Sequence, residues 1–83
     1  MERLKGAVLK ILESGSRTME QIGSLAPREL VRDFGQELKR IGFTNSVSLA
    51  VNMLKEEGKI LKTQGRRRLD TAEYSYVLTS NLI

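Results

Sequence analysis

The sequence predicts a mainly α-helical domain that closes with a small antiparallel β-hairpin. Apolar residues recur at helical spacing through most of the chain before Gly58, which indicates amphipathic helices. After Gly58 the pattern changes to short runs rich in β-branched and aromatic residues, near 59–63 and 74–79, which indicate two strands. The chain has 83 residues, so we expect one domain over residues 1–83.

The first helix is expected between Glu2 and Glu13, with Lys5 and Lys10 off its inward face. Gly15 ends it, because glycine readily adopts the left-handed conformation that closes helices. The inward face consists of apolar residues at spacings of three and four: Leu4, Ala7, Val8, Ile11 and Leu12.

Two further helices are expected before residue 42. Thr18 and Gln21 have the spacing of a capping box, which opens a short helix with Met19 and Ile22 facing inward. Pro27 fits the first position of the next helix, where its missing N–H costs nothing. The expected inward stripe of that helix, weakened at Gly35, is Leu30, Phe34, Leu38 and Ile41.

The last helix is expected over residues 45–57, with Thr44 or Asn45 as its N-cap and Gly58 at its end. Its inward face is apolar and consists of Val47, Ala50, Val51 and Leu54. Its opposite face is polar and consists of Asn45, Ser46, Ser48, Asn52 and Lys55.

The hairpin holds most of the excess positive charge. Formal net charge is +4, and five basic residues without any acid lie in one stretch: Lys59, Lys62, Arg66, Arg67 and Arg68. The rest of the chain is close to neutral. Such a concentrated patch favours binding to a polyanion. The three arginines are expected in a connection of about ten residues, a length that is commonly functional.

Catalytic chemistry has little support in this composition. The chain has no histidine for general acid–base work and no cysteine for nucleophilic attack or metal ligation. Asp70 and Glu73 lie beside the arginines and are interpreted as local charge balance, not as a metal site. We therefore expect a non-enzymatic protein without a cofactor. No apolar run approaches the ~18 residues of a membrane span, so we expect a cytoplasmic protein.

Three segments resemble the winged helix-turn-helix superfamily: Ser16–Ile22 opening the second helix, Leu54–Ile60 leaving the last helix, and Tyr76–Thr79 returning from the hairpin. The resemblance covers nearly the whole chain and is specific to the fold. It implies three to four helices followed by a two-stranded wing. The long segment over residues 27–41 departs from the simplest pattern of that superfamily.

The resemblance also implies double-stranded DNA binding in transcription or replication regulation. The helix over residues 45–57 would be the recognition helix in the major groove, and the basic wing over residues 62–72 would lie on the backbone. Asparagine can pair with an adenine edge, and serine with any base. The expected base contacts are Asn45, Ser46, Ser48 and Asn52. The expected phosphate contacts are Lys55, Lys62, Arg66, Arg67, Arg68 and Arg17. Alternatively, the three consecutive arginines would enter the minor groove, where the negative potential attracts arginine.

Other interpretations of the same residues stay open. The polar helix face also has the composition of a solvated surface, and arginines on a hairpin also protect an edge from aggregation. Tyr74 and Tyr76 share one strand face and are expected in the core, with base stacking as the alternative. Winged helices also act as scaffolds, so a protein partner or a homodimer is the rival hypothesis, and RNA binding is a third. The apolar contact would then involve Leu49, Met53, Leu61, Leu82 and Ile83.

Overall fold

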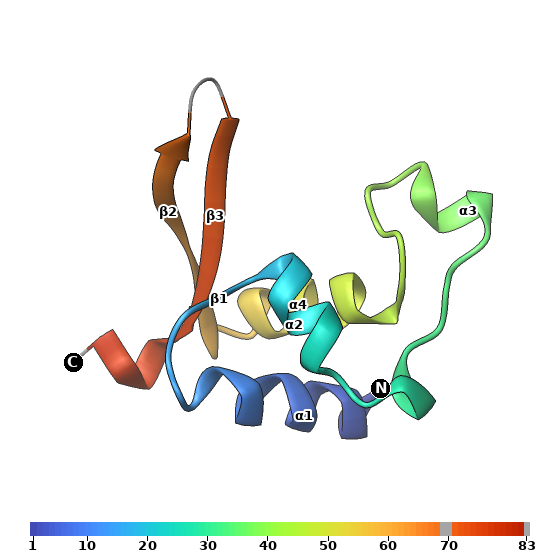
Figure 1. Cartoon of the computed structure of the whole chain (residues 1–83). Coiled ribbons are helices and arrows are strands. Elements are labelled where there is room, and N and C mark those ends of the chain that lie inside the picture. Colours follow the sequence, from blue (N-terminus) through green and yellow to red (C-terminus); the bar gives the residue numbers. More distant parts are fainter. Residues whose placement is uncertain (69–70, 83) are drawn as a thin grey trace.

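Three main helices and a three-stranded antiparallel sheet make up the described part of the chain (Figure 1). The computed structural model describes the backbone of residues 1–68 and 71–82, and the side chains of residues 1–36, 38–63 and 74–80. The elements are α1 (Glu2–Leu12), β1 (Arg17–Thr18), α2 (Met19–Leu25), the 3-10 turn η1 (Arg28–Leu30), α3 (Gln36–Lys39), α4 (Ser46–Glu56), β2 (Ile60–Arg68), β3 (Thr71–Leu78) and the 3-10 turn η2 (Thr79–Leu82). The expected combination of helices with an antiparallel hairpin is confirmed.

The core lies where α1, α2, α4 and the base of the hairpin meet. It consists of the buried side chains of Leu4, Val8, Leu12, Ile22, Ala26, Val47, Ala50, Val51, Leu54, Ile60 and Tyr76. The expected inward faces of the first and last helices are therefore largely confirmed, with Ala7 and Ile11 only half-buried, whereas in the second helix Ile22 is buried and Met19 half-buried. Removal of one large buried side chain from such a core costs roughly 2–5 kcal/mol.

The helix ends follow local sequence signals. The Gln21 N–H donates to Thr18 Oγ1 at 3.2 Å, and the Thr18 N–H donates to Gln21 Oε1 at 3.0 Å, so the expected capping box is confirmed. Gly15 and Gly58 follow α1 and α4 with φ angles of 136° and 77°, in the region that favours glycine.

A third strand joins the hairpin to the helices. The short strand β1 lies between α1 and α2 and pairs with β3, through Arg17 opposite Tyr76 and Thr18 opposite Ser75. The sheet order is β1-β3-β2, so β3 is the central strand. The sequence did not predict β1, because two residues carry no periodic signal. Its pairing fixes the start of α2 beside the hairpin.

The hairpin strands are longer than the sequence predicts, and the expected ten-residue connection is wrong. β2 continues to Arg68 and β3 starts at Thr71, with an irregular register between Gln64 and Arg67. Figure 1 shows the hairpin rising well beyond the helices. The ribbon of this outer part projects beyond the helices, and its sequence lacks the alternation of apolar and polar residues that marks a core-facing strand, although backbone pairing continues the ladder. Without that alternation, the sequence pattern missed it.

The expected helix after Pro27 is also wrong. Pro27 precedes only the single turn η1, after which the chain is extended before the short helix α3. Backbone groups in this connector bond to the segment before α4, since the Phe34 N–H donates to Thr44 O at 3.3 Å and the Ser46 N–H donates to Arg32 O at 2.8 Å. These contacts replace the hydrogen bonds that a continuous helix would make.

Lys5 is buried, although the sequence places it off the inward face. Its side chain retains only 8% exposure, and Nζ donates to the Glu57 carboxylate, just beyond α4, and to Glu2 Oε1 at 3.4 Å. The hydrogen bond from Lys5 is the main cause that lowers the pKa of Glu57, with a smaller effect from Lys59 at 3.4 Å. The same bond with Glu57 raises the pKa of Lys5. The pair ties α1 to the end of α4.

Replacement Glu57→Gln should lower the melting temperature at neutral pH, because the Lys5 ammonium then stays buried without its strongest partner. The folded-state pKa of Glu57 is lowered, so its contribution is present above the unfolded value of about 4.3 and is lost as pH falls through the folded value. Thermal melts from about pH 7 to about pH 3 measure this.

The difference in melting temperature between wild type and Glu57→Gln should shrink at the acid end of that series. The double variant Lys5→Met/Glu57→Gln is the matched control, and it should recover stability because no buried charge is left alone. A difference that stays constant with pH would contradict the ion pair.

Candidate nucleic-acid interface

The start of α4 is held by its own polar side chains. The Ser48 N–H donates to Asn45 Oδ1 at 3.1 Å, and the Asn45 N–H donates to Ser48 Oγ at 3.3 Å. Ser48 Oγ also donates to Asn45 O at 2.7 Å. The expectation that Asn45 caps the helix is confirmed. Both side chains were also expected to contact bases. In the structure they make the hydrogen bonds of the helix cap.

Ser46 was expected on the exposed polar face, and this is wrong. Its exposure is 5%, and its Oγ accepts a hydrogen bond from the Arg32 N–H at 2.8 Å and donates to Leu30 O at 3.2 Å. The connector after η1 folds back over the first turn of α4 and covers this hydroxyl. Ser46 therefore anchors the connector, and its side chain is not part of the exposed polar face.

The part of the polar face that remains open lies further along α4. Ser48, Asn52 and Lys55 follow each other at spacings of four and three, so they share one side of the helix. Lys55 is exposed, and the other two are half-buried. They line a shallow groove together with residues of three other segments: Met19, Gly42, Phe43 and Tyr76. The polar face of α4 thus lines a groove together with Val51 of the same helix, and Tyr76 of β3 lines it as well.

The inner face of the hairpin continues from this groove. Lys62 is the register partner of Tyr76, and Tyr74 lies two residues from Tyr76, so the three share one face. Tyr76 is buried, as expected, and burial raises its pKa. Tyr74 was also expected in the core, and this is wrong, because the helices cover only the base of the hairpin and leave it 46% exposed. Lys62 Nζ lies 4.2 Å from the centroid of the Tyr74 ring.

The three consecutive arginines belong to a strand and not to a loop. The backbone of Arg66, Arg67 and Arg68 is part of β2, and the ladder pairs Arg67 with Ala72 and Arg68 with Thr71. Their side chains lie outside the described residues, so their contact with phosphate stays a prediction. They come after Lys62 along the same strand.

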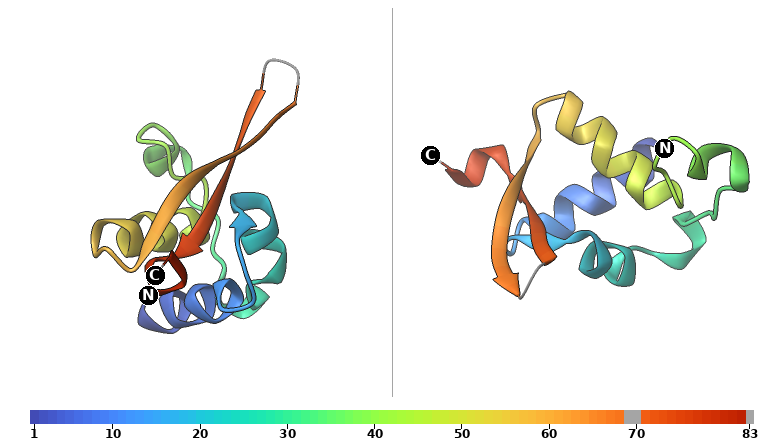
Figure 2. Two further views of the ribbon diagram at one scale, coloured as in Figure 1. Left: turned by 90° about the vertical axis from the view of Figure 1, so that its left-hand side faces the viewer. Right: turned by 90° about the horizontal axis from the view of Figure 1, so that it is seen from above.

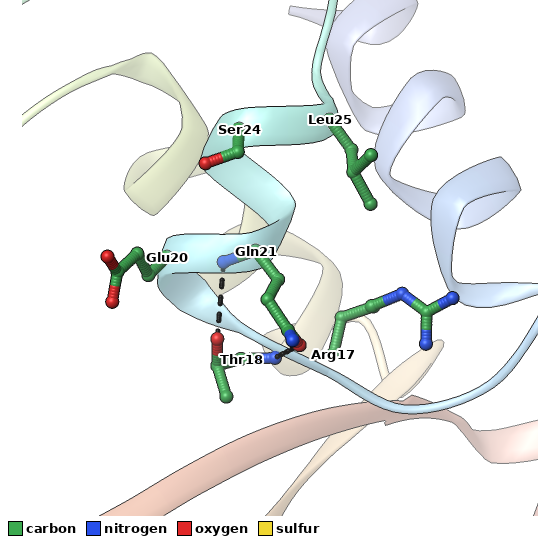
Figure 3. Close-up of a pocket in the computed structure, with 6 residues that line it drawn as sticks. All are labelled: Arg17, Thr18, Glu20, Gln21, Ser24 and Leu25. Carbon is green, nitrogen blue, oxygen red and sulfur yellow. Dashed lines mark hydrogen bonds between the residues drawn. The ribbon is translucent and has the colours of Figure 1, made fainter.

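Arg17 lies apart from the groove. Its Nη1 donates to Ser16 O at 2.9 Å and its Nη2 to Ser14 Oγ at 3.2 Å, so it braces the turn between α1 and β1. Figure 3 shows its guanidinium turned away from Glu20. The hollow it borders is a different one, lined by Arg17, Thr18, Glu20, Gln21, Ser24 and Leu25. The structure does not bring Arg17 together with the α4 residues.

The surroundings of the groove are shaped by two projections. Figure 1 shows the hairpin and α3 rising on the same side of the molecule, with α4 between them and α1 on the far side. The left view of Figure 2, turned by 90°, again places both projections on the side away from α1. We call this side, with the α4 groove and the inner hairpin face, the upper face.

No protein-family model matches the chain, and neither a curated protein nor a solved structure is similar enough to count as a relative. Among the described residues, no group of three or more histidine, cysteine, aspartate or glutamate side chains is placed to hold a metal ion. In the same part of the chain, no helix combines the length and apolar character that crossing a membrane requires.

The capping geometry makes a prediction for Asn45. Replacement Asn45→Ala should lower the free energy of unfolding by about 1 kcal/mol, because the Ser48 N–H loses its acceptor. Urea denaturation followed by circular dichroism measures the change. Asn45→Ser is the matched control and should stay within a few tenths of a kcal/mol of wild type, because serine is an equally good N-cap. Equal stability of the alanine and serine variants would contradict the capping role.

Proposed function

We propose that the protein binds double-stranded DNA, with α4 in the major groove and the hairpin along the phosphate backbone. The observation that carries this proposal is the continuity of the upper face. The polar side of α4, represented by Asn52 and Lys55, runs past Tyr76 onto the exposed pair Lys62 and Tyr74. Beyond that pair, β2 leads to the arginine-rich end of the hairpin.

The dimensions and side chains of α4 fit this role. A helix of 11 residues is about 16 Å long, and the major groove is about 12 Å wide and admits one helix. Asn52 is the best-placed residue to read a base, because its side chain is not used in the helix cap and an amide can pair with the N6 and N7 atoms of adenine. Lys55 lies one turn nearer the hairpin, where a phosphate contact is expected.

The order of the elements supports the resemblance to the winged helix-turn-helix superfamily. A helix, a short strand, two further main helices and a hairpin follow each other, and the first strand pairs with the last. The connector with α3 is an addition to that simple order. Within this proposal the hairpin is the wing and α4 is the recognition helix.

The rival hypothesis of a protein-binding scaffold receives less support. Of the apolar residues that would form the contact, Leu49 and Met53 are half-buried. Leu49 lines a groove with Phe34 and Leu38 of the connector. Leu61 is 41% exposed. The side chains of residues 82–83 lie outside the described part. The described members of this set therefore offer one exposed side chain instead of a patch.

The hairpin assignment predicts the behaviour of the triple variant Arg66→Ala/Arg67→Ala/Arg68→Ala. Its affinity should fall for every duplex sequence, and the slope of log affinity against log salt should fall by up to about 2.7, since each phosphate contact contributes about 0.9. Fluorescence anisotropy of a labelled random duplex at several salt concentrations measures both. Unchanged affinity with an unchanged slope would remove the hairpin from the interface.

Asn52 is predicted to determine sequence preference. Once a preferred duplex has been selected from a random pool, Asn52→Ala should lose about 1–3 kcal/mol of discrimination at one adenine position, while binding to random duplex stays the same. Competition titrations with single-base variants of the selected duplex measure this. Full retention of the preference by the alanine variant would contradict base contact by Asn52.

A further inference from the structure

The connector between α2 and α4 carries an exposed basic tip at the end of α3. Lys39 is the last residue of α3, Arg40 follows it, and both side chains are exposed. Ile41, which the sequence placed on an inward stripe, is 64% exposed beside them. Neither Lys39 nor Arg40 makes an ion pair with another described side chain. Among the described side chains these two cations have no acidic partner, and both are exposed to solvent, where an anion can reach them.

Hydrogen bonds within the connector hold the segment that carries the tip. The Phe34 N–H donates to Thr44 O at 3.3 Å, and the Phe43 N–H donates to Leu38 O at 3.0 Å. Phe34 and Leu38 are half-buried and line a groove with Leu49 of α4. The apolar side chains of the connector therefore lie toward α4, and the basic tip projects away from α4.

The position of the tip is opposite the hairpin. In Figures 1 and 2, α3 projects on the upper face at one end of α4, whereas the hairpin projects at the other end. The longest dimension of the molecule is 34 Å, close to one turn of duplex DNA at about 34–36 Å. The tip and the hairpin therefore fit within about one turn of a duplex.

We propose that the Lys39–Arg40 tip is a second backbone contact, which binds phosphates on the border of the groove opposite the one that the hairpin contacts. This inference rests on the proposed DNA binding. A helix in the major groove has a phosphate backbone on each side, so a protein with a basic projection at each end of that helix contacts both. Arginine can bind phosphate through two parallel hydrogen bonds, and lysine adds a point charge.

The test compares three variants on the same labelled random duplex by anisotropy at several salt concentrations. Lys39→Ala/Arg40→Ala removes the tip charges. Lys10→Ala removes one charge from an exposed residue of α1, the helix on the far side from the upper face, and Ile41→Ser changes the tip without changing its charge. Thermal melts of all three establish that each variant is folded.

The tip variant should bind more weakly than wild type, and its salt slope should fall by about 1.8, whereas the α1 variant and Ile41→Ser should stay close to wild type. Hydroxyl-radical footprinting on a selected duplex should show wild type protecting both borders of the groove. The tip variant should lose one border, and the triple arginine variant should lose the other.

The two levels of the proposal fail in different ways. Binding by wild type together with equal effects of the tip and α1 variants would overturn the tip contact and leave DNA binding intact. A loss caused by Ile41→Ser but not by the tip variant would overturn it as well and would indicate an apolar partner for the tip. No binding of wild type to any duplex would overturn the DNA proposal itself.

Discussion

The turn at Gly58 fixes the hairpin against α4, and the upper face exists only because of that turn. The Lys59 N–H donates to Leu54 O at 3.0 Å, so the chain leaves the helix in a defined direction. On the returning strand the Thr79 N–H donates to Lys59 O at 3.0 Å, and Thr79 Oγ1 donates to Gly58 O at 2.7 Å. Both ends of the hairpin are therefore tied to one point, and Ile60 is buried directly beside it.

The helix α4 has one side in the core and another side on the upper face. One side is buried against α1 and the base of the hairpin, and the contact of Lys5 with Glu57 holds its end to α1. Its first turn is occupied by capping and by the connector, through Asn45 and Ser46. The open polar side is consequently shorter than the sequence indicates and is concentrated on Asn52 and Lys55, next to the hairpin.

The sequence predicted those features that local rules determine. The three main helices, the capping pair at Thr18 and the closing Gly58 follow from periodicity and from residues a few positions apart. It failed where distant segments decide the environment. Ser46 is covered by a connector whose sequence has no helical or strand periodicity. Lys5 is buried beside Glu57, which is 52 residues away in the sequence. Tyr74 has the pattern of a core residue but lies beyond the reach of the helices.

The most direct test is to record backbone amide chemical shifts while a duplex of about one helical turn is added to the labelled protein. If α4 and the hairpin form one DNA-binding surface, the largest changes in chemical shift will be at Asn52, Lys55, Lys62 and Tyr74. The amide of Lys10 on α1 will show almost no change. Shifts concentrated on α1, or on Leu61 alone, would contradict that surface, as would unchanged spectra at low salt.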